Sequence, residues 1–379
     1  MSAILPGATI GILGGGQLGR MTAMAARPLG YKVHVLDPDP SCAARFVVER
    51  CLTAAFDDDF AAADLARHCA VVTLEIEKIA PASMAAVRRY APIRPGSEVL
   101  AAIQDRGRQR KWLSDHGFPT VEWRRVTGVA ELSSAVAALG PRSFVKSCTG
   151  GYDGRGQARM SDANEAAGVW ASLGSLPCVV ERAATLEAEL SVLVARTPSG
   201  QVAVHPVAQN HHDHGVLTWS VIPAGLPDKV LKEASEIARG IAEEMKVEGL
   251  LVVELFLTAG GVLRVNELAP RPHNSFHASE VGCVTSQFEQ AVRAVCDLPL
   301  GSTAVVKPAA IHNLLGDLWV GDQPPRFERA LEIPGVRLHL YGKRIARPGR
   351  KMGHLSALGE TSAEATARVI EAWRRVQTP

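Results

Sequence analysis

The chain has 379 residues, more than a single hydrophobic core normally serves, so two or three domains are expected. Its 41 lysines and arginines nearly balance 39 aspartates and glutamates, and this balance argues against a nucleic-acid partner. No stretch approaches the ~20 apolar residues of a membrane span. The seven cysteines contain no CxxC pair, which argues against a disulfide framework and a structural zinc site. We therefore expect a cytoplasmic globular enzyme.

The first hundred residues alternate between strand and helix patterns. Residues 8–13 read as a buried strand, 14–19 as a glycine turn, and 18–29 as a helix. Apolar strands follow at 32–36 and 71–74. This alternation predicts an α/β fold with a parallel, doubly wound sheet. Its ligands should lie beyond the carboxyl ends of the strands, where Asp37, Glu75 and Glu77 fall.

The remaining chain reads as two further α/β units. A helix over residues 99–116 follows a proline- and glycine-marked boundary near residues 92–96. Residues 120–183 then predict a small unit, with strands at 143–146 and 178–181 around a glycine loop. Strands dominate beyond residue 190, with one clear helix over 228–245. We divide the chain into residues 1–105, 106–185 and 186–379.

The glycine turn fits the pattern G-x-G-x-x-G between a strand and a helix, with Asp37 at the usual distance. Taken alone, this pattern predicts a dinucleotide and an NAD-dependent oxidoreductase. The alternative is that the glycines only pack the helix closely on its sheet, or that they bind another phosphate. The stronger signals lie elsewhere in the chain.

A second glycine-rich element follows the strand that ends at Lys146. The sequence KSCTGGYDGRGQ places four glycines and Arg155 directly after this lysine. Glycines free the backbone to wrap phosphates, and the two basic side chains supply positive charge. A flexible hairpin with solvated charges is the alternative. The element lacks the Gly-Lys-Ser/Thr ending of a Walker loop, so a different nucleotide-binding loop is predicted.

The segment 250–268 reads as a β-hairpin with two acidic side chains on one face. With the turn centred on residues 259–260, Glu254 lies opposite Val265, and Glu267 lies diagonally from Glu254 within about 7–8 Å. Their expected companions on this face are Val252, Phe256, Leu263 and Val265. Two carboxylates on an apolar face favour Mg²⁺ held jointly with substrate phosphates. Neutralisation by Arg264 or Arg271, or a wet face, is the alternative.

Polar residues also gather after the hairpin and near the C-terminus. Arg271, His273 and Asn274 lie in a proline-fixed loop, where an anionic substrate is the natural partner. Lys343 and Arg350 belong to a basic loop that is either a solvated charge run or a phosphate site. The histidine-rich run at 210–214 lacks zinc-ligand spacing.

Five motifs occur in one order along the chain: GGYDGRGQ, NELAPRPHNS, TSQFEQ, NLLGD and YGK with RPGRKMGH. Together with the glycine turn they resemble the 5-(carboxyamino)imidazole ribonucleotide synthases, which are ATP-grasp enzymes. The resemblance covers nearly the whole chain. It implies a three-domain ATP-grasp architecture with an N-terminal Rossmann-like sheet, usually in a homodimer. It also implies ATP, Mg²⁺, bicarbonate and 5-aminoimidazole ribonucleotide as ligands. The implied reaction is the carboxylation of this ribonucleotide in purine synthesis, with carboxyphosphate as its intermediate.

The resemblance assigns residues to each ligand. Glu254 and Glu267 would hold Mg²⁺, Arg271 and His273 would lie near bicarbonate and the transferred phosphoryl group, and Asp153 would handle a proton of the amine. The implied nucleotide residues are Arg106, Lys146, Gly151, Tyr152, Asp153, Gly154, Arg155, Gly156, Gln157, Glu181, Arg182, Ala183, Ala184, Glu189, His212, Asn266 and Glu267. The implied ribonucleotide residues are Gly16, Gln17, Leu18, Glu75 or Glu77, Tyr152, Asp153, Arg155, Lys343 and Arg350.

The chain departs from the family pattern after His273-Asn274-Ser275. Phe276 stands where the family has glycine, and the glutamate expected a few residues further on is absent, with Glu280-Val281 in its place. A phenylalanine beside the active site could reshape the amine pocket. A related carboxylate–amine ligase with another acceptor is therefore an alternative, as is a non-catalytic nucleotide-binding protein.

Overall fold

The computed structural model describes residues 2–140, 142–151, 156–319 and 325–377. These described residues form three β-sheets, within residues 9–74, 123–182 and 186–358. One sheet therefore falls in each of the three predicted units, whose boundaries at residues 105 and 185 remain a proposal. The glycine-loop residues Tyr152, Asp153, Gly154 and Arg155 lie outside the described residues, so the roles expected of them stay predictions.

The first sheet is entirely parallel, with strand order β3-β2-β1-β4. Helices cover both faces: Ile10 and Val33 pack with α1 and α10, whereas Leu36 packs with α2 and α3. Burial from both sides explains the continuous apolar runs of these strands. The predicted doubly wound sheet is confirmed. Its elements are β1 (Thr9–Leu13), α1 (Gln17–Ala26), β2 (Lys32–Asp37), β3 (Arg50–Thr53), α2 (Asp59–Arg67), β4 (Val71–Leu74) and α3 (Pro81–Arg88).

The single helix predicted over residues 99–116 is wrong, because the chain forms α4 (Ser97–Ile103) and α5 (Arg106–Asp115). The Asp105 carboxylate accepts a hydrogen bond from the backbone N–H of Arg108 at 2.8 Å and so begins a second helix. The Gln104 side chain donates to the carbonyls of Glu77 and Ile79, which fixes the junction on the N-terminal domain. The new helix start orients α5 toward the glycine loop.

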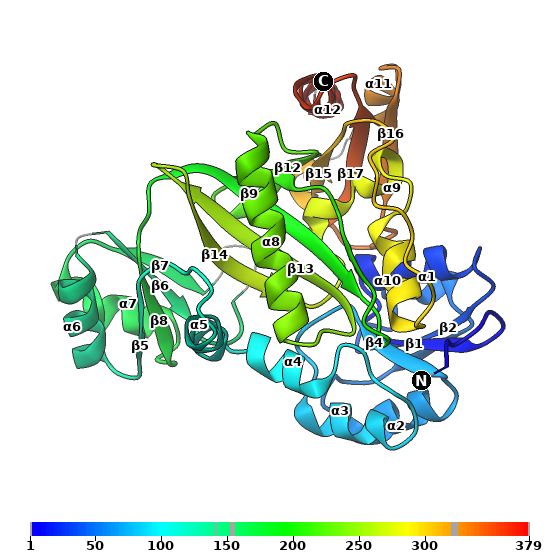
Figure 1. Ribbon diagram of the computed structural model, residues 1–379, viewed down its shortest axis with the longest axis horizontal. Helices are drawn as coiled ribbons and strands as arrows, with labels where there is room; N and C mark the ends of the chain where they lie inside the picture. Colours follow the sequence, from blue (N-terminus) through cyan, green and yellow to red (C-terminus); the bar gives the residue numbers. More distant parts are fainter. Residues whose placement is uncertain (1, 141, 152–155, 320–324, 378–379) are drawn as a thin grey trace.

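The small unit is an antiparallel sheet with strand order β5-β8-β6-β7, seen at one end of the molecule in Figure 1. Alternation along β6 buries Val145 against α6 and α7 and leaves Phe144 and Lys146 on the opposite face. That face borders the central cleft. The elements are β5 (Trp123–Val126), α6 (Val129–Leu139), β6 (Ser143–Ser147), β7 (Gln157–Met160), α7 (Ala166–Ser172) and β8 (Cys178–Arg182).

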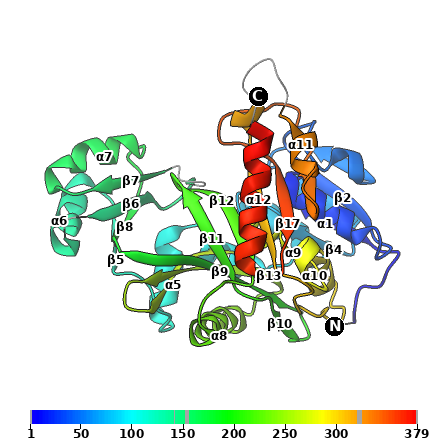
Figure 2. The same ribbon diagram turned by 90° about the horizontal axis from the view of Figure 1, so that it is seen from above.

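The third sheet is the largest, with strand order β14-β13-β9-β11-β12-β15-β17-β16 and β10 paired to β9. Helix α12 packs along β12, β15 and β17 and buries Val369 and Ala372 there. Figure 2 shows α12 alongside β12 and β17. The strands are β9 (Leu186–Arg196), β10 (Val202–Val204), β11 (Ala208–Asp213), β12 (Val216–Ile222), β13 (Gly249–Thr258), β14 (Val262–Ala269), β15 (Ala309–Leu315), β16 (Val336–Leu340) and β17 (Lys351–Leu358). The helices are α8 (Asp228–Glu244), α9 (Ser279–Gly282), α10 (Gln287–Val295), α11 (Phe327–Leu331) and α12 (Ser362–Gln377).

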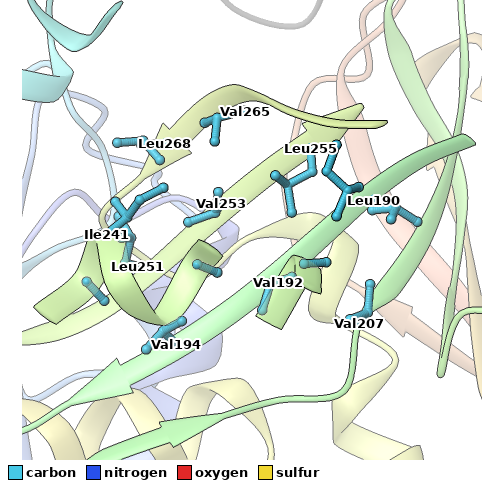
Figure 3. Close-up of a cluster of buried hydrophobic side chains, with 14 of the residues drawn as sticks. Leu190, Val192, Val194, Val207, Ile241, Leu251, Val253, Leu255, Val265 and Leu268 are labelled. Atoms are coloured by element: carbon cyan, nitrogen blue, oxygen red, sulfur yellow. The ribbon is translucent and has the colours of Figure 1, made fainter. Parts of the chain in front are cut away.

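Helix α8 closes the largest core cluster against β9, β13 and β14 (Figure 3). It buries Ala234, Ala238 and Ile241 at helical spacing and carries its charges on the other face. Each fully buried Leu, Ile or Val of this cluster contributes about 1.5–3 kcal/mol relative to an exposed one. No helix in the described part of the chain is long and apolar enough to cross a membrane.

The hairpin β13–β14 exists as predicted, but the predicted register is wrong. Its loop has three residues, so Thr258 pairs with Val262, and a β-bulge then makes Glu254 lie directly opposite Glu267. The bulge adds Asn266 to β14, which reverses the side-chain alternation beyond it. The three-residue loop pairs Leu263 with Leu257 and Val265 with Leu255, so both point into the core beneath α8 rather than accompanying Glu254. The two acids share one face, as expected.

Candidate active site

The three units surround one large cleft of about 1970 Å³. Predicted site residues from every unit line it: Gln17, Leu18, Glu75, Glu77, Arg106, Lys146, Gly151, Gln157, Glu181, Arg182, Ala184, Glu189, His212, Glu254, Asn266, Glu267, Arg271, His273, Lys343 and Arg350. Among the described predicted residues, Gly16, Gly156 and Ala183 do not line it. Gln17 and Arg350, 333 positions apart in sequence, thus share one cleft, because the sheets meet there.

The glycine turn is closed by the chain's own carboxylates. Glu75 accepts the backbone N–H groups of Gly16 and Gly19, both at 2.8 Å, and Asp37 accepts that of Gly15 at 2.7 Å. A Cβ on Gly16 would lie 2.6 Å from a Glu75 oxygen, so close packing requires this glycine. The amides that a dinucleotide pyrophosphate needs are already satisfied. The dinucleotide interpretation, and the oxidoreductase built on it, are therefore wrong.

Lys146 is part of a buried three-residue charge network. The Glu181 carboxylate on β8 lies 2.7 Å from the Lys146 Nζ and 2.6 Å from a guanidinium nitrogen of Arg110. Burial raises the pKa of Glu181, but the charges of Arg110 and Lys146 outweigh burial and lower it to about 2. Glu181 therefore stays ionised and fixes the lysine. The sequence analysis missed Arg110, whose only signal was its place four residues after Arg106.

Arg106 supports the base of the glycine loop. Its guanidinium donates to the carbonyls of Ser147 and Gly151, both at 2.9 Å, and lies 3.9 Å from Glu267. At the other end of the loop, the backbone N–H of Ser147 donates to the Gly156 carbonyl at 2.8 Å. Gly156 has φ +70°, and a Cβ there would lie 2.6 Å from the Ser147 hydroxyl. Gly156 is thus needed for loop geometry.

Glu254 and Glu267 form the acidic part of the cleft. Burial, followed by the charge of Glu267, raises the pKa of Glu254 to about 7. Asn266 donates to Glu254 Oε2 at 3.3 Å and accepts from Lys146 at 3.4 Å. Two facing carboxylates beside an amide oxygen are the hard donors that Mg²⁺ takes, and a dication would relieve their repulsion. The donor set therefore fits Mg²⁺.

A histidine–glutamate pair borders the acidic part on β9 and β11. The Nδ1 of His212 lies 2.8 Å from a Glu189 oxygen. Burial lowers the pKa of His212, but the hydrogen bond to Glu189 and nearby acids give a net increase. The pair keeps polar groups at the cleft wall next to β13.

The loop after β14 supplies one cation and one neutral imidazole. Arg271 Nε lies 3.0 Å from a Glu77 oxygen, across the boundary to the N-terminal domain. His273 Nδ1 is 2.9 Å from the Ser275 hydroxyl, which turns Nε2 to within 3.5 Å of Glu254. Burial, then the charge of Arg271, holds the pKa of His273 well below its ordinary value. Gln287 fixes this loop through the backbone N–H and C=O of His273, and the sequence analysis missed it.

The C-terminal basic loop faces the N-terminal glycine turn. Lys343, Arg350 and the unpredicted Arg344 and Arg347 line the cleft together with Gln17. Lys343 donates to the Lys351 carbonyl at 2.7 Å, and Arg350 to the Ile345 carbonyl at 2.7 Å, so backbone contacts shape the loop. Such a concentration of cations at one wall suits a phosphate group. The structure thus favours the phosphate interpretation over a solvated charge run.

Phe276 does not reach the cleft. Its side chain is completely buried in an alanine-rich core that includes Ala195, Ala208 and Ala294, and its ring contacts His205 edge-on. The small alanine side chains leave the room that this large ring fills. The suggestion that Phe276 reshapes the amine pocket is therefore wrong, and the main reason for another amine acceptor is removed.

Three family models match the chain in the order of its units. The ribonucleotide synthetase preATP-grasp domain matches residues 7–104, and the ATP-grasp domain matches residues 111–288. The phosphoribosylaminoimidazole carboxylase C-terminal domain matches residues 309–368. Fold, cleft and matches together define an ATP-grasp ligase.

Relatives along the whole chain narrow this class to one family. An N5-carboxyaminoimidazole ribonucleotide synthase of Brucella melitensis biotype 1 is 38% identical over 359 residues, which cover 94% of this chain and 98% of the relative. A crystal structure of the ADP complex of an N5-carboxyaminoimidazole ribonucleotide synthetase matches with a TM-score of 0.93 and 38% identity over 100% of both chains. The enzyme of Aspergillus clavatus, in complex with ADP and 5-aminoimidazole ribonucleotide, matches at 0.89 and 31% identity over 97% and 98%. The chain belongs to the N5-carboxyaminoimidazole ribonucleotide synthase family.

Proposed function

We propose that this chain uses ATP to carboxylate the exocyclic amine of 5-aminoimidazole ribonucleotide with bicarbonate. A bicarbonate oxygen attacks the γ-phosphorus of ATP, the bond to the bridging oxygen breaks, and ADP leaves. The amine then attacks the carboxyl carbon of carboxyphosphate, or CO₂ released from it. Phosphate leaves, and the amine loses a proton. The observation that carries this proposal is one cleft with an acidic pair and a basic loop on separate walls.

ATP would lie between the small unit and the large sheet. Lys146 and Arg106 would meet its phosphates from one side, and Glu254 and Glu267 would hold Mg²⁺ from the other. The metal would neutralise phosphate charge that develops during transfer. Glu181 and Arg110 would contribute to ATP binding indirectly, because their buried contacts hold Lys146 in place. Apolar side chains of Phe144, Phe256 and Leu268 also line the cleft and suit a purine ring.

Bicarbonate and the transferred phosphoryl group would lie beside Arg271 and His273. Glu77 and the Pro272 carbonyl fix the Arg271 guanidinium, so the N–H groups that these contacts leave over can bind an anion without reorganisation. The neutral His273 ring adds a hydrogen-bonding nitrogen near Glu254. Closure of the glycine loop would exclude water from carboxyphosphate, which hydrolyses readily. Asp153 and Arg155 in that loop remain the candidates for the amine proton and the substrate charge.

The ribonucleotide would bind between the glycine turn and the basic loop. Its phosphate would meet Lys343 and Arg350, and its remaining polar groups would meet Gln17 and Glu77. Both oxygens of Glu75 already accept backbone N–H groups, so of the two acids we propose Glu77 as the substrate contact. The two walls are far apart in sequence, so substrate binding would also bridge the first and last units.

The experiment that tests this proposal is phosphate release from ATP with Mg²⁺ and bicarbonate, with and without 5-aminoimidazole ribonucleotide. We expect release that depends on the ribonucleotide and that is lost in Glu267→Gln. Glu187→Gln is the matched control, because Glu187 is exposed on neighbouring β9 outside the cleft. Nucleotide binding without any response to the ribonucleotide would eliminate this substrate and favour another amine or a purely binding role.

We also propose a homodimer and a cytoplasmic location, on the basis of the family resemblance. Sedimentation of the purified chain across a concentration series measures the first. A mass of one chain at all concentrations would contradict the dimer. Fractionation of the source cells measures the second, and recovery outside the cytoplasmic fraction would contradict it.

A further inference from the structure

A second group of metal-ligand side chains lies where α9 meets β16 and β17, away from the cleft. It consists of Glu280, His339 and His354. The two histidines are directly opposite in the β16–β17 ladder, and their rings stack with centroids 5.1 Å apart. Glu280 lies over them, with Oε2 at 3.8 Å from His339 Nδ1 and 3.9 Å from His354 Nε2. None of the three belongs to the described lining of the cleft.

Surrounding contacts fix the orientation of the buried histidine. The Tyr341 hydroxyl is 2.9 Å from His354 Nδ1, which leaves Nε2 directed at Glu280. The ring of His277 stacks on His354 with 4.8 Å between centroids and is held by Gln287 at 3.0 Å. Metal-binding histidines commonly have their second nitrogen fixed by an oxygen in this way. Tyr341 and His354 are both almost completely buried, so this geometry is preorganised.

Charge at the group favours a metal that prefers nitrogen. Glu280 is its one carboxylate, and the Nε2 of the buried His354 is directed at that carboxylate. Arg20 on α1 faces His339 and donates to the Ala43 carbonyl at 3.0 Å. One carboxylate with two imidazoles is a poor site for Mg²⁺ or Ca²⁺, which prefer oxygen ligands. Two imidazoles and a carboxylate are typical of zinc-class ions.

We propose that Glu280, His339 and His354 bind a divalent transition-metal ion of the zinc class. Their ligand atoms lie within 4.8 Å of one another. Tetrahedral zinc, with bonds of about 2.0–2.2 Å, separates its ligands by about 3.3–3.5 Å, so small side-chain movements complete the site. Glu280 and His339 are partly exposed, which leaves a path for the ion and room for water as fourth ligand. The ion would tie α9 to the strand that leads to Lys343.

The test uses Co²⁺ as a spectroscopic probe of the full chain. The purified protein is dialysed against Co²⁺ in excess Mg²⁺, which competes for the Glu254–Glu267 pair. We expect one retained cobalt per chain, with visible d–d absorption and without sulfur-to-cobalt charge-transfer bands. His339→Ala should lose the retained ion. His214→Ala, at a 96% exposed histidine side chain, is the matched control and should keep it.

A third variant tests the orientation argument without removing a ligand. Tyr341→Phe keeps all three ligands and the ring but loses the hydrogen bond to His354, so metal affinity should fall about 10–100-fold. Circular dichroism of each variant reports whether the fold is retained. Absence of retained cobalt in the unmodified chain, equal retention in His339→Ala, or sulfur bands would each overturn the site. None of these outcomes depends on the proposed carboxylation, because metal binding is measured without substrates.

Discussion

Glu254 lies directly opposite Glu267 across the β13–β14 hairpin, and a bulge at Asn266 produces this pairing. If the regular ladder continued beyond the Leu255–Val265 pair, Glu254 would face Asn266, and Glu267 would point to the other side of the sheet. The bulge also places the Asn266 amide between Glu254 and Lys146, at 3.3 and 3.4 Å. One irregular residue therefore joins the acidic pair to the lysine of the small unit.

The raised pKa of Glu254 predicts a pH dependence of Mg²⁺–nucleotide binding. Burial, then the charge of Glu267, holds this pKa at about 7, and the metal takes the deprotonated carboxylate. We therefore expect affinity for Mg²⁺–ADP to increase as pH rises through 7. Isothermal titration calorimetry over a pH series measures it. Glu254→Gln should remove the dependence, whereas Glu187→Gln should keep it; a flat profile for the unmodified chain contradicts the prediction.

Stability of the metal-free protein should respond in the opposite direction. The folded pKa of Glu254, about 7, lies above its ordinary value of 4.5, so the folded state binds more protons between these pH values. The stabilising contribution is complete below about pH 4.5 and is lost as pH rises through 7. Urea unfolding of the unmodified chain and of Glu254→Gln, compared across this window, isolates the contribution. A difference between the two that does not change with pH would refute it.

The glycine turn should be intolerant of a methyl group. In Gly16→Ala, the new Cβ would lie 2.6 Å from a Glu75 oxygen, although the backbone φ of −70° suits alanine. We expect the free energy of unfolding to fall by about 1–3 kcal/mol from this overpacking. Gly168→Ala is the control: its Cβ meets nothing within 4 Å and should stabilise α7 by about 0.5–1 kcal/mol. Equal urea midpoints for the two variants would show that Glu75 does not confine the turn.

The buried pair of Arg110 and Glu181 should be far more sensitive than a surface pair. Arg110→Met removes one of two cations from a carboxylate whose side chain is 4% exposed, which costs about 3–5 kcal/mol. Arg239→Met breaks the exposed pair with Glu243 and should cost less than about 1 kcal/mol. Urea unfolding measures both. Similar losses of unfolding free energy in the two variants would contradict the prediction that the buried pair is the more sensitive one.

Glu181 also contributes to acid stability. Its folded pKa of about 2 lies below the ordinary 4.5, so its contribution is present above about pH 4.5 and is lost as pH falls toward 2. Arg110→Met should weaken this dependence. The contribution of Glu181 to the free energy of unfolding increases with pH, whereas that of Glu254 decreases with pH. Because the first change falls between about pH 2 and 4.5 and the second between about pH 4.5 and 7, urea unfolding over a pH series separates them.

Local patterns in the sequence were sufficient for the elements that they determine directly. The strand at 71–74 was predicted at its observed bounds, because an isolated apolar run between polar residues has few other interpretations. The existence of the hairpin followed from its two apolar strands and the glycine turn between them, whereas its two acids share a face through a bulge that the sequence analysis did not predict. Most described residues that the motifs assigned to the site line one cleft, although their roles stay predictions.

Features that depend on distant contacts could not be predicted. Glu75 closes the glycine turn across 56 and 59 positions, and Arg110 meets Glu181 across 71. Nothing near either residue in sequence indicates its partner. The bulge at Asn266 was missed because a hairpin register read from its turn assumes a regular ladder. The helix break at Asp105 was missed because a cap is decided by one side chain within an otherwise helical pattern.

Phe276 should prove to be a determinant of stability rather than of substrate choice. Phe276→Ala empties a completely buried site among alanines, which cannot fill it, so the free energy of unfolding should fall by about 3–5 kcal/mol. The KM for 5-aminoimidazole ribonucleotide should stay unchanged, because the ring does not line the cleft. Urea unfolding and steady-state kinetics at low temperature measure the two quantities on the same preparation. An altered KM with little loss of stability would instead place this ring in control of the amine acceptor, since only contact with substrate would change KM while leaving the core intact.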